Sequence, residues 1–313
     1  MQKISVVLPV YNGGTYLKLS VESVLNQDYK NFEILILDDC SNDGSREYLN
    51  ELSDNRIVYF KNNSNKGLFY NLNFLIEKST TNLIKLWAQD DIMYPDCLGT
   101  IIAFHTAHPY ISFSYSGRTI IDENGIVISN PIVDNTPEIV SFDLHARIAF
   151  FTGSIAGNIA NVCISKEKLN LVGGFDETMK ISGDFDMWVK LSKVGNIGHI
   201  KQNIIYLRDH KDQLSRKGEY LLFHVKEDIK VYKKLLSLCN ESLAREGLNL
   251  LRKYKFVFYY TLMTKSLIKG EFRTSQAYYK LLQPYTNLFS QYYYWLRAKL
   301  FKQSKPAFLH FPS

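Results

Sequence analysis

Short apolar runs and amphipathic stretches alternate along the first third of the chain. The runs at 4–10 and 32–37 are rich in Val, Ile and Leu, which is typical of buried strands. Between them Leu17, Val21 and Val24 recur at helical spacing and form one apolar stripe. The alternation continues, with further strands expected at 56–60, 82–87 and 111–115 and further helices at 45–52, 68–78 and after Pro95. This order predicts an α/β fold with a doubly wound, mostly parallel sheet.

The middle of the chain carries weaker patterns, and a helical region follows it. Turn signals within 118–138 indicate a hairpin or an ordered loop. A short helix is expected at 144–151, a short strand at 162–165 and a helix at 184–194. Beyond residue 219 we expect successive helices, broken at Gly247, Gly270 and Pro284.

The charge distribution divides the chain near residue 215. Residues 1–215 hold 19 Lys and Arg against 25 Asp and Glu, whereas residues 216–313 hold 18 against 6. We therefore expect a sheet domain over 1–215 and a basic, aromatic-rich helical region over 216–313. Such a region is typical of proteins that meet nucleic acid, a membrane surface or a phosphorylated substrate, although a solvated helical surface has the same composition.

Aromatic residues interleave the basic ones at 253–260 and 291–302. Single-stranded nucleic acid would suit this pattern through base stacking. A membrane interface suits it at least as well, because Trp and Tyr lie at the headgroups while Lys and Arg meet anionic lipid. We expect these helices to dock on an anionic membrane surface or to form a homo-oligomer, with nucleic acid as the less favoured partner.

No apolar run reaches the ~18 residues typical of a membrane span, and the first three residues lead straight into a predicted strand without a signal peptide. The expected location is cytoplasmic, with peripheral contact at the inner face of the cell membrane. The four cysteines lie far apart, which argues against a zinc knuckle or a disulfide framework: Cys40, Cys97, Cys163 and Cys239.

Paired carboxylates follow two of the predicted strands. Asp38 and Asp39 end the run ILILDD, and Asp90 and Asp91 end NLIKLWAQDD. The carboxyl ends of parallel strands form the ligand crevice of an open α/β sheet, so these side chains should converge there. A divalent ion completed by substrate phosphates fits such a crevice best, because neither GxGxxG nor a Walker motif is present. Alternatively, the first pair only caps the turn that follows it.

Four ordered segments resemble the sequence blocks of family 2 glycosyltransferases of the GT-A fold. They span about residues 2–215 and read SVVLPVYNGGTYLKLSVESVLNQDYKNFEILILDDCSNDGS, NKGLFYNLN, WAQDDIMYPDCL and GGFDETMKISGDFDMWVKL. The resemblance implies a GT-A, Rossmann-like sheet and an inverting enzyme that uses a nucleotide sugar and a divalent ion, Mn²⁺ or Mg²⁺.

The resemblance also implies roles for individual residues. Asp184 would be the catalytic base, Asp39 would bind the uracil of a UDP-sugar, and Asp90 would face the ribose or the sugar. Asp91 would bind the metal, and His210 is a second candidate ligand, although a single histidine is more often structural. The remaining donor-site candidates come from the first loop and the NKGLFYNLN block: Pro9, Val10, Tyr11, Asn12, Gly67 and Asn73.

Three positions depart from the family pattern. Ala88 stands where a longer acidic motif has its first Asp, Gly183 where the catalytic dipeptide has its Glu, and Leu72 where an Arg is often found. We interpret Asp186 as a helix cap or ion-pair partner and Trp188 as a core residue rather than an acceptor platform.

The sequence therefore predicts a metal-dependent, inverting glycosyltransferase of the hexosyl or N-acetylhexosaminyl type. Its donor would be a nucleotide sugar, UDP-linked, and its acceptor a hydroxyl of a glycan or of a polyprenyl-diphosphate-linked sugar in surface polysaccharide assembly, such as capsule or O-antigen. The departures at Gly183 and Leu72 leave open a catalytically inactive GT-A scaffold or binding subunit. The metal-binding acids leave open a sugar nucleotidyltransferase.

Overall fold

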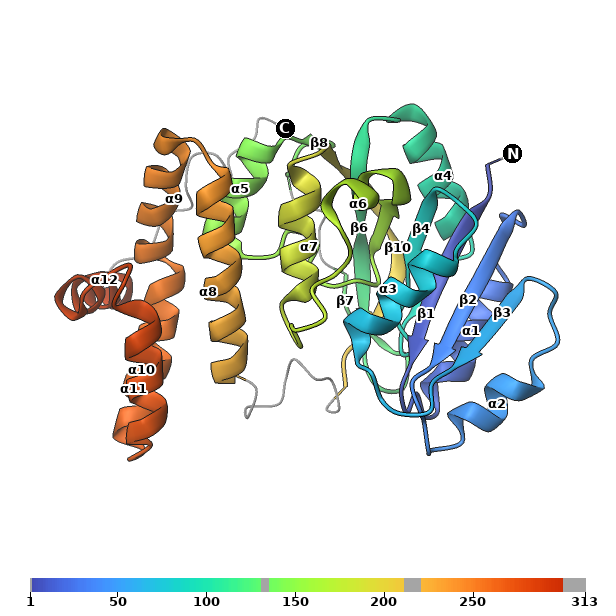
Figure 1. Cartoon of the computed structure of the whole chain (residues 1–313), viewed down its shortest axis with the longest axis horizontal. Coiled ribbons are helices and arrows are strands. Elements are labelled where there is room, and N and C mark those ends of the chain that lie inside the picture. The colour runs from blue at the N-terminus through green and yellow to red at the C-terminus, as the bar shows by residue number, and fades with distance from the viewer. Residues whose placement is uncertain (1, 131–134, 211–220, 301–313) are drawn as a thin grey trace.

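A ten-stranded sheet forms the centre of the molecule in a computed structural model that describes residues 2–130, 135–210 and 221–300 (Figure 1). The strands are β1 (Ile4–Val10), β2 (Phe32–Asp38), β3 (Ile57–Lys61), β4 (Leu83–Leu86), β5 (Ile92–Met93), β6 (Ile111–Ile121), β7 (Val127–Ser129), β8 (Ile139–Val140), β9 (Val162–Ser165) and β10 (Asn196–Arg208). Their order is β3-β2-β1-β4-β9-β6-β10-β5, with β7 and β8 paired to β6 and β10. The first four strands are parallel, as are β6 and β10, while β9 runs antiparallel between β4 and β6.

Helices cover both faces of the sheet (Figure 1). They are α1 (Tyr16–Leu25), α2 (Ser45–Glu51), α3 (Leu68–Lys78), α4 (Cys97–Ala107), α5 (Phe142–Thr152), α6 (Lys166–Val172), α7 (Gly183–Ser192), α8 (Leu221–Leu238), α9 (Glu241–Lys253), α10 (Lys255–Ile268), α11 (Phe272–Leu282) and α12 (Leu288–Leu300). Alternate side chains of a strand point to opposite faces, so β1 contributes to two cores. Val6 and Leu8 pack with α1 and α4, whereas Val7 packs with α3 and α7.

The predicted fold class and the hairpin of β6 and β7 are confirmed, but several elements were missed or misplaced. The prediction omitted β5, β8, α6 and β10, and the pairing of β10 with β6 shifts register at Asn203. The prediction also placed a helix break at Gly247, which lies inside α9. A Cβ at that glycine would lie 2.2 Å from the ring of Phe150, so the glycine lets α9 approach α5 closely.

The C-terminal helices pack directly against the sheet domain. Phe150 of α5 and Trp188 of α7 share one apolar cluster with Tyr232 of α8 and Phe256 of α10. Figure 1 shows α8 beside α7 and α9 beside α5, and these pairs are in contact. The predicted boundary near residue 215 lies outside the described residues, and the division into two domains stays a prediction. Across the described part of the chain, no helix combines the length and apolar character that a membrane span needs.

Candidate active site

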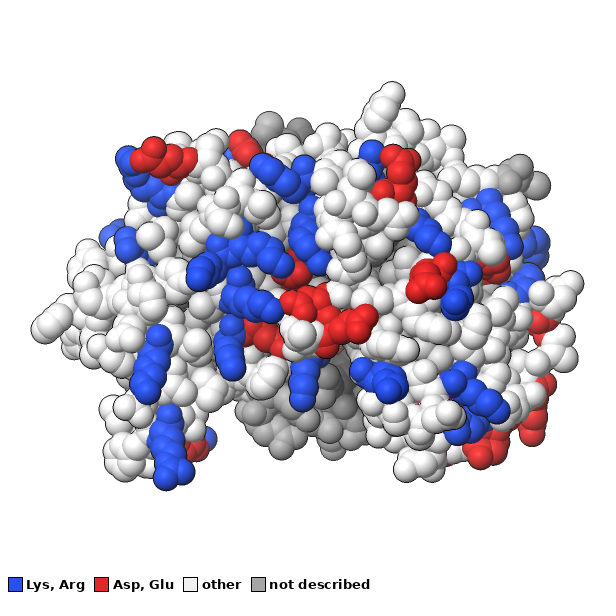
Figure 2. Space-filling view, in the orientation of Figure 1, with Lys and Arg blue, Asp and Glu red and all other residues white. Residues whose placement is uncertain are grey.

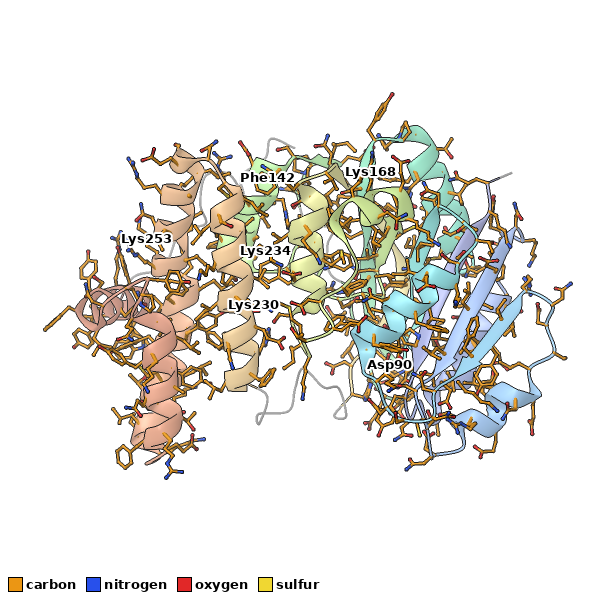
Figure 3. All side chains as sticks on the ribbon, in the orientation of Figure 1. Asp90, Phe142, Lys168, Lys230, Lys234 and Lys253 are labelled. Atoms are coloured by element: carbon orange, nitrogen blue, oxygen red, sulfur yellow. The ribbon has the colours of Figure 1, made fainter. Side chains whose placement is uncertain are left out.

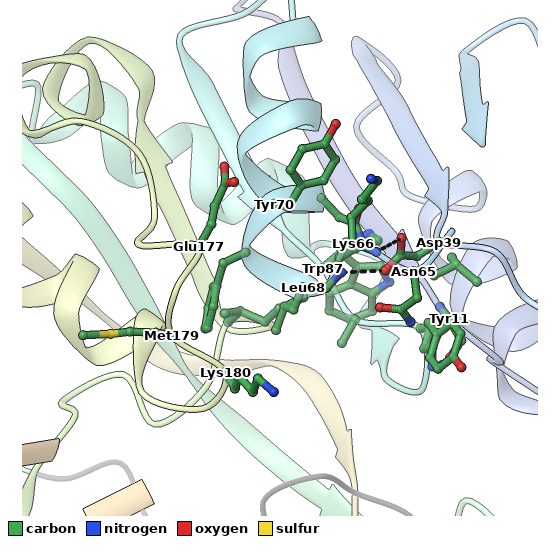
Figure 4. A pocket seen from close by; sticks show the side chains of 18 of the residues that line it. Tyr11, Asp39, Asn65, Lys66, Leu68, Tyr70, Trp87, Glu177, Met179 and Lys180 are labelled. Atoms are coloured by element: carbon green, nitrogen blue, oxygen red, sulfur yellow. Dashed lines mark hydrogen bonds between the residues drawn. The ribbon is translucent and has the colours of Figure 1, made fainter. Parts of the chain in front are cut away.

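A cleft of about 690 Å³ lies at the carboxyl ends of the parallel strands. Because β2 and β4 flank β1, the residues that follow them, Asp39 and Asp90, both line the cleft. The expected convergence is confirmed for these two side chains. Tyr11 lies on the same side of the cleft as Asp39, and Glu177, Met179 and Lys180 line the opposite wall (Figure 4).

Three N–H donors hold the buried carboxylate of Asp39 in the cleft. Its Oδ1 accepts hydrogen bonds from Asn62 Nδ2 (2.8 Å) and from the backbone N–H of Lys66 (2.8 Å), and its Oδ2 accepts one from the N–H of Gly67 (2.9 Å; Figure 4). Gly67 has a φ of 89°, a conformation that favours glycine. An ionised carboxylate offers about four lone-pair sites, so Asp39 can accept one more donor from the cleft.

Asp38 is directed to the turn that follows β2. Its Oδ1 accepts a hydrogen bond from the N–H of Ser41 (3.0 Å), and its Oδ2 accepts one from Nε of Arg46 (2.6 Å). The alternative reading of the first acidic pair as turn residues therefore describes Asp38, while Asp39 faces the cleft.

Gln89 and Asn12 hold the first loop in place. The side chain of Gln89 accepts from the N–H of Tyr11 (2.9 Å) and donates to its carbonyl (3.0 Å). Asn12 has a φ of 51° and accepts from the N–H of Asn42 (2.9 Å), which ties the loop to the turn after β2. The loop residues that line the cleft are Pro9, Val10 and Tyr11.

The two aspartates after β4 occupy different environments. Asp91 is buried, and its Oδ1 accepts a hydrogen bond from the N–H of Arg208 (2.8 Å). Burial, and next the charge of Asp90, raise the pKa of Asp91 well above its ordinary value. Asp90 lines the cleft, with its Oδ2 2.9 Å from Nε2 of His210. The ring of His210 packs 5.3 Å from that of Tyr16.

This geometry bears on the predicted metal ligands. Asp90 and His210 present a carboxylate oxygen and an imidazole nitrogen side by side, and these suit a divalent ion that also binds substrate phosphates. Within the described ranges no three His, Cys, Asp or Glu side chains are grouped to hold a metal. The burial of Asp91 favours Asp90, rather than Asp91, as the carboxylate ligand.

A second cavity of about 450 Å³ adjoins the cleft, and Leu68, Phe69 and Ile159 line both. Asp184, in the first turn of α7, lies in the wall of this second cavity. The far wall comes from the C-terminal helices and carries His224, Asp228 and Lys255. The two cavities therefore meet at Leu68, Phe69 and Ile159, and Asp184 belongs to the second of them.

The surroundings of Asp184 suit a proton acceptor. Burial raises its pKa to about 7, and the negative charges of Asp228 and Glu227 add to the rise. The N–H of Phe185 donates to its Oδ1 (2.7 Å) and partly opposes this effect. A carboxylate with a pKa near neutrality takes up a proton more readily than an ordinary aspartate does at the same pH.

The packing around Gly183 and Leu72 explains two of the departures from the family pattern. A Cβ on Gly183 would lie 2.5 Å from the ring of Phe69, so a glutamate does not fit there while that ring is in place. The ring itself stacks on Phe175 at 5.6 Å. Leu72 is completely buried in the apolar cluster, where an arginine would lack water or a counter-charge.

Three further residues singled out in the sequence make contacts within the protein that support the fold. The amide of Asn73 accepts from the N–H of Phe175 (2.7 Å) and donates to its carbonyl (3.0 Å), so it supports the loop behind the cleft wall. Asp186 is buried and forms an ion pair with Lys234. Trp188 is buried and stacks on Phe113 at 5.0 Å. The prediction missed several lining residues. Three of them lie inside the blocks that resemble the family, namely Gln89, Glu177 and Lys180, whereas no block covers His224, Asp228 and Lys255.

A model of the family described as "Glycosyl transferase family 2" matches residues 5–157. This part of the chain belongs to that family. The chain is 28% identical to an uncharacterized glycosyltransferase of Rickettsia bellii over 68% of its own length and 31% of the relative's. It is also 28% identical to the putative glycosyltransferase EpsE of Bacillus subtilis, over 69% and 76% of the two chains. Chondroitin synthase of Escherichia coli is 28% identical over 81% and 34%. The chain thus spans about a third of the length of the first curated relatives that it matches.

Two solved structures share the fold of this chain. Staphylococcus aureus TarS 1–349 in complex with UDP-GlcNAc has a TM-score of 0.70 at 17% identity, over 91% of this chain and 80% of TarS. Mannosyltransferase PcManGT from Pyrobaculum calidifontis in complex with GDP-Man and Mn²⁺ has a TM-score of 0.58 at 14% identity, over 95% and 79%. These likenesses bear out the GT-A fold.

Proposed function

We propose that this protein transfers a sugar from a nucleotide-sugar donor in the cleft to an acceptor hydroxyl in the adjoining cavity. The observation that carries the proposal is the position of Asp184, which lies in a cavity that adjoins the cleft and has a pKa raised to about 7. The match of residues 5–157 to a glycosyltransferase family supports the same reaction class.

The proposed donor is a UDP-sugar. Asp39 has one acceptor position left after its three protein hydrogen bonds, and the N–H of a uracil ring suits it. Gly67 and Tyr11 would contact the nucleotide because they line the same part of the cleft. The complex of TarS with UDP-GlcNAc supports a donor of this kind.

A divalent ion, Mn²⁺ or Mg²⁺, would be held by Asp90 and His210 together with the donor. When bound, the ion acts as a Lewis acid for the charge on a leaving diphosphate. Asp91 and Arg208 would support this site by fixing the chain, since Nε of Arg208 donates to the carbonyl of Asp90 (2.9 Å). The Mn²⁺ in the PcManGT complex supports the choice of ion.

In the proposed reaction Asp184 takes the proton of the acceptor hydroxyl while the hydroxyl oxygen attacks the anomeric carbon. The bond between that carbon and the diphosphate oxygen breaks, and its electron pair leaves with the nucleotide. A single displacement of this kind inverts the anomeric configuration. The ring of Phe69, which borders both cavities, would limit where the acceptor can lie.

The proposed acceptor is a glycan or a polyprenyl-diphosphate-linked sugar in polysaccharide synthesis, with a hexose or N-acetylhexosamine transferred. The relative named chondroitin synthase supports polysaccharide synthesis. We retain membrane docking or self-association as the proposed role of residues 216–313.

Product analysis separates the proposal from its two alternatives. The full chain would be incubated with Mn²⁺, a panel of UDP-sugars and glycan acceptors. Release of UDP, lost in Asp184→Asn while calorimetry with UDP and Mn²⁺ still detects binding, is the expected result. Pyrophosphate release would point instead to a nucleotidyltransferase, and binding without turnover over long incubation to an inactive scaffold.

A further inference from the structure

Helix α8 braces the segment that leads into α7 with charged side chains. Nζ of Lys230 donates to Oδ2 of Asp176 (2.8 Å), and Lys234 pairs with the buried carboxylate of Asp186. Figure 3 shows both lysines on α8, and Figure 2 shows acidic side chains near the middle of this face with Lys and Arg around them. Asp184 lies within the braced segment.

Glu227 of α8 also holds this segment, because its carboxylate accepts hydrogen bonds from three consecutive backbone N–H groups. Its Oε1 accepts from Lys180 (2.8 Å), and its Oε2 accepts from Ile181 (3.0 Å) and Ser182 (2.8 Å). Glu227 is only 6% exposed, so water does not replace these bonds. Successive N–H groups that converge in this way form an anion-binding concavity, and here a side chain of the same protein fills it.

The chain at the start of α7 lacks a cap of its own. Ser182, the N-cap residue, makes no side-chain capping bond, because its Oγ donates to Oδ1 of Asp228 (2.8 Å). Gly183 has no side chain, and the ring of Phe69 fills the adjacent space. The conformation of the segment two residues before Asp184 therefore depends on α8.

We propose that Glu227 is a positioning residue for glycosyl transfer: by holding the backbone at 180–182 it places the carboxylate of Asp184 in the acceptor cavity. The proposal rests on the proposed role of Asp184 as the base. It makes the C-terminal helices part of the catalytic unit, because their first helix sets the geometry of a group in the sheet domain.

Glu227 also acts on Asp184 through its charge. It is one of two α8 carboxylates, with Asp228, that raise the pKa of Asp184. The other charged or titratable groups in the cavity wall are His224 on α8 and Lys255 on α10. Loss of the Glu227 charge should therefore lower the pKa of Asp184, which a purely structural role would not do.

The test compares Glu227→Gln with Glu246→Gln in the full chain. Glu246 of α9 pairs with Arg147 of α5 (3.0 Å), so it also links a C-terminal helix to the sheet domain, but not at the segment before Asp184. In Glu227→Gln we expect faster hydrogen exchange at the amides of 180–182 and a lower pKa of Asp184 by carboxyl NMR. UDP binding should be unchanged, and kcat should fall on the order of 10²-fold, the effect of about 1 Å misplacement.

Glu246→Gln should leave all four measurements unchanged, and Glu227→Asp, which keeps the charge, should restore the NMR pKa and part of kcat. Wild-type exchange at 180–182 in Glu227→Gln, or an equal loss of kcat in both Gln variants, would overturn the proposal. If Glu227→Gln does not fold, the test uses Glu227→Asp instead. Unchanged hydrogen exchange at 180–182 and unchanged kcat in Glu227→Asp would contradict the proposal. Hydrogen exchange and NMR do not require turnover, so they test the role of Glu227 independently of the base assignment. An incorrect base assignment would be detected separately, as an active Asp184→Asn.

Discussion

Replacing Asp184 with Asn should abolish transfer and make the protein more stable at alkaline pH. Burial raises the pKa of this carboxyl from 3.8 to about 7. At ~1.4 kcal/mol per pH unit, the difference corresponds to at most about 4 kcal/mol in the free energy of unfolding. The real value will be smaller, because Asn lacks the second acceptor oxygen and Asp184 keeps some contact with solvent.

The sign follows from the direction of the pKa change. The folded state binds this proton more tightly than the unfolded state, so the associated stability is full below about pH 4 and is lost as the pH rises through about 7. Asn does not titrate in this range. The stability of Asp184→Asn relative to the wild type should therefore increase between about pH 5 and about pH 8.5, by roughly 1–3 kcal/mol.

Urea unfolding at the two pH values measures this difference. Asp54→Asn is the control, because Arg56 lowers the pKa of Asp54 to about 2 and its contribution is constant over the same window. A difference between Asp184→Asn and the wild type that is the same at both pH values would refute the electrostatic reasoning. Full turnover by Asp184→Asn would refute the base assignment.

Three further predictions concern the metal, the departure at residue 183 and the C-terminal region. Asp90→Asn should weaken Mn²⁺-dependent UDP binding in calorimetry at least tenfold, whereas Asp91→Asn, at a buried position, should weaken it much less; the reverse order would restore Asp91 as the ligand. Gly183→Ala should destabilise the protein by about 1–3 kcal/mol in urea unfolding, because the added Cβ would meet the ring of Phe69. Adding Phe69→Leu should recover part of the lost stability, and a Gly183→Ala variant more stable than the wild type would contradict the clash. The full chain should sediment with phosphatidylglycerol vesicles at low salt and not with phosphatidylcholine vesicles, because α12 combines an exposed Phe289 with Arg297 and Lys299. Equal sedimentation with both kinds of vesicle would argue against membrane docking.

Local patterns in the sequence were sufficient to predict the four parallel strands β1 to β4 and the position of Asp39. A buried strand that ends in a carboxylate leaves few choices for where that group lies, and the parallel order brings Asp39 and Asp90 to one cleft. The same reasoning could not separate Asp90 from Asp91. Their difference depends on Arg208, which lies more than a hundred residues further along the chain and covers Asp91.

The environment of Asp184 also lay beyond the sequence pattern. Its pKa depends first on burial and then on the charges of Asp228 and Glu227, which lie in a helix whose local pattern is simply amphipathic. Gly183 looked like the loss of a catalytic glutamate, yet the ring of Phe69 from a distant helix explains why no side chain fits. Both effects arise from packing between elements far apart in the chain, which single-sequence patterns do not contain.

The pH dependence of UDP release by the wild-type protein, with a UDP-sugar, Mn²⁺ and an accepted glycan, tests the central claim most directly. Because Asp184 must be ionised to take the acceptor proton and its pKa is about 7, kcat should rise about tenfold per pH unit below pH 7 and level off above it. A profile that is flat between about pH 5 and about pH 8, or a product other than UDP, would contradict the account.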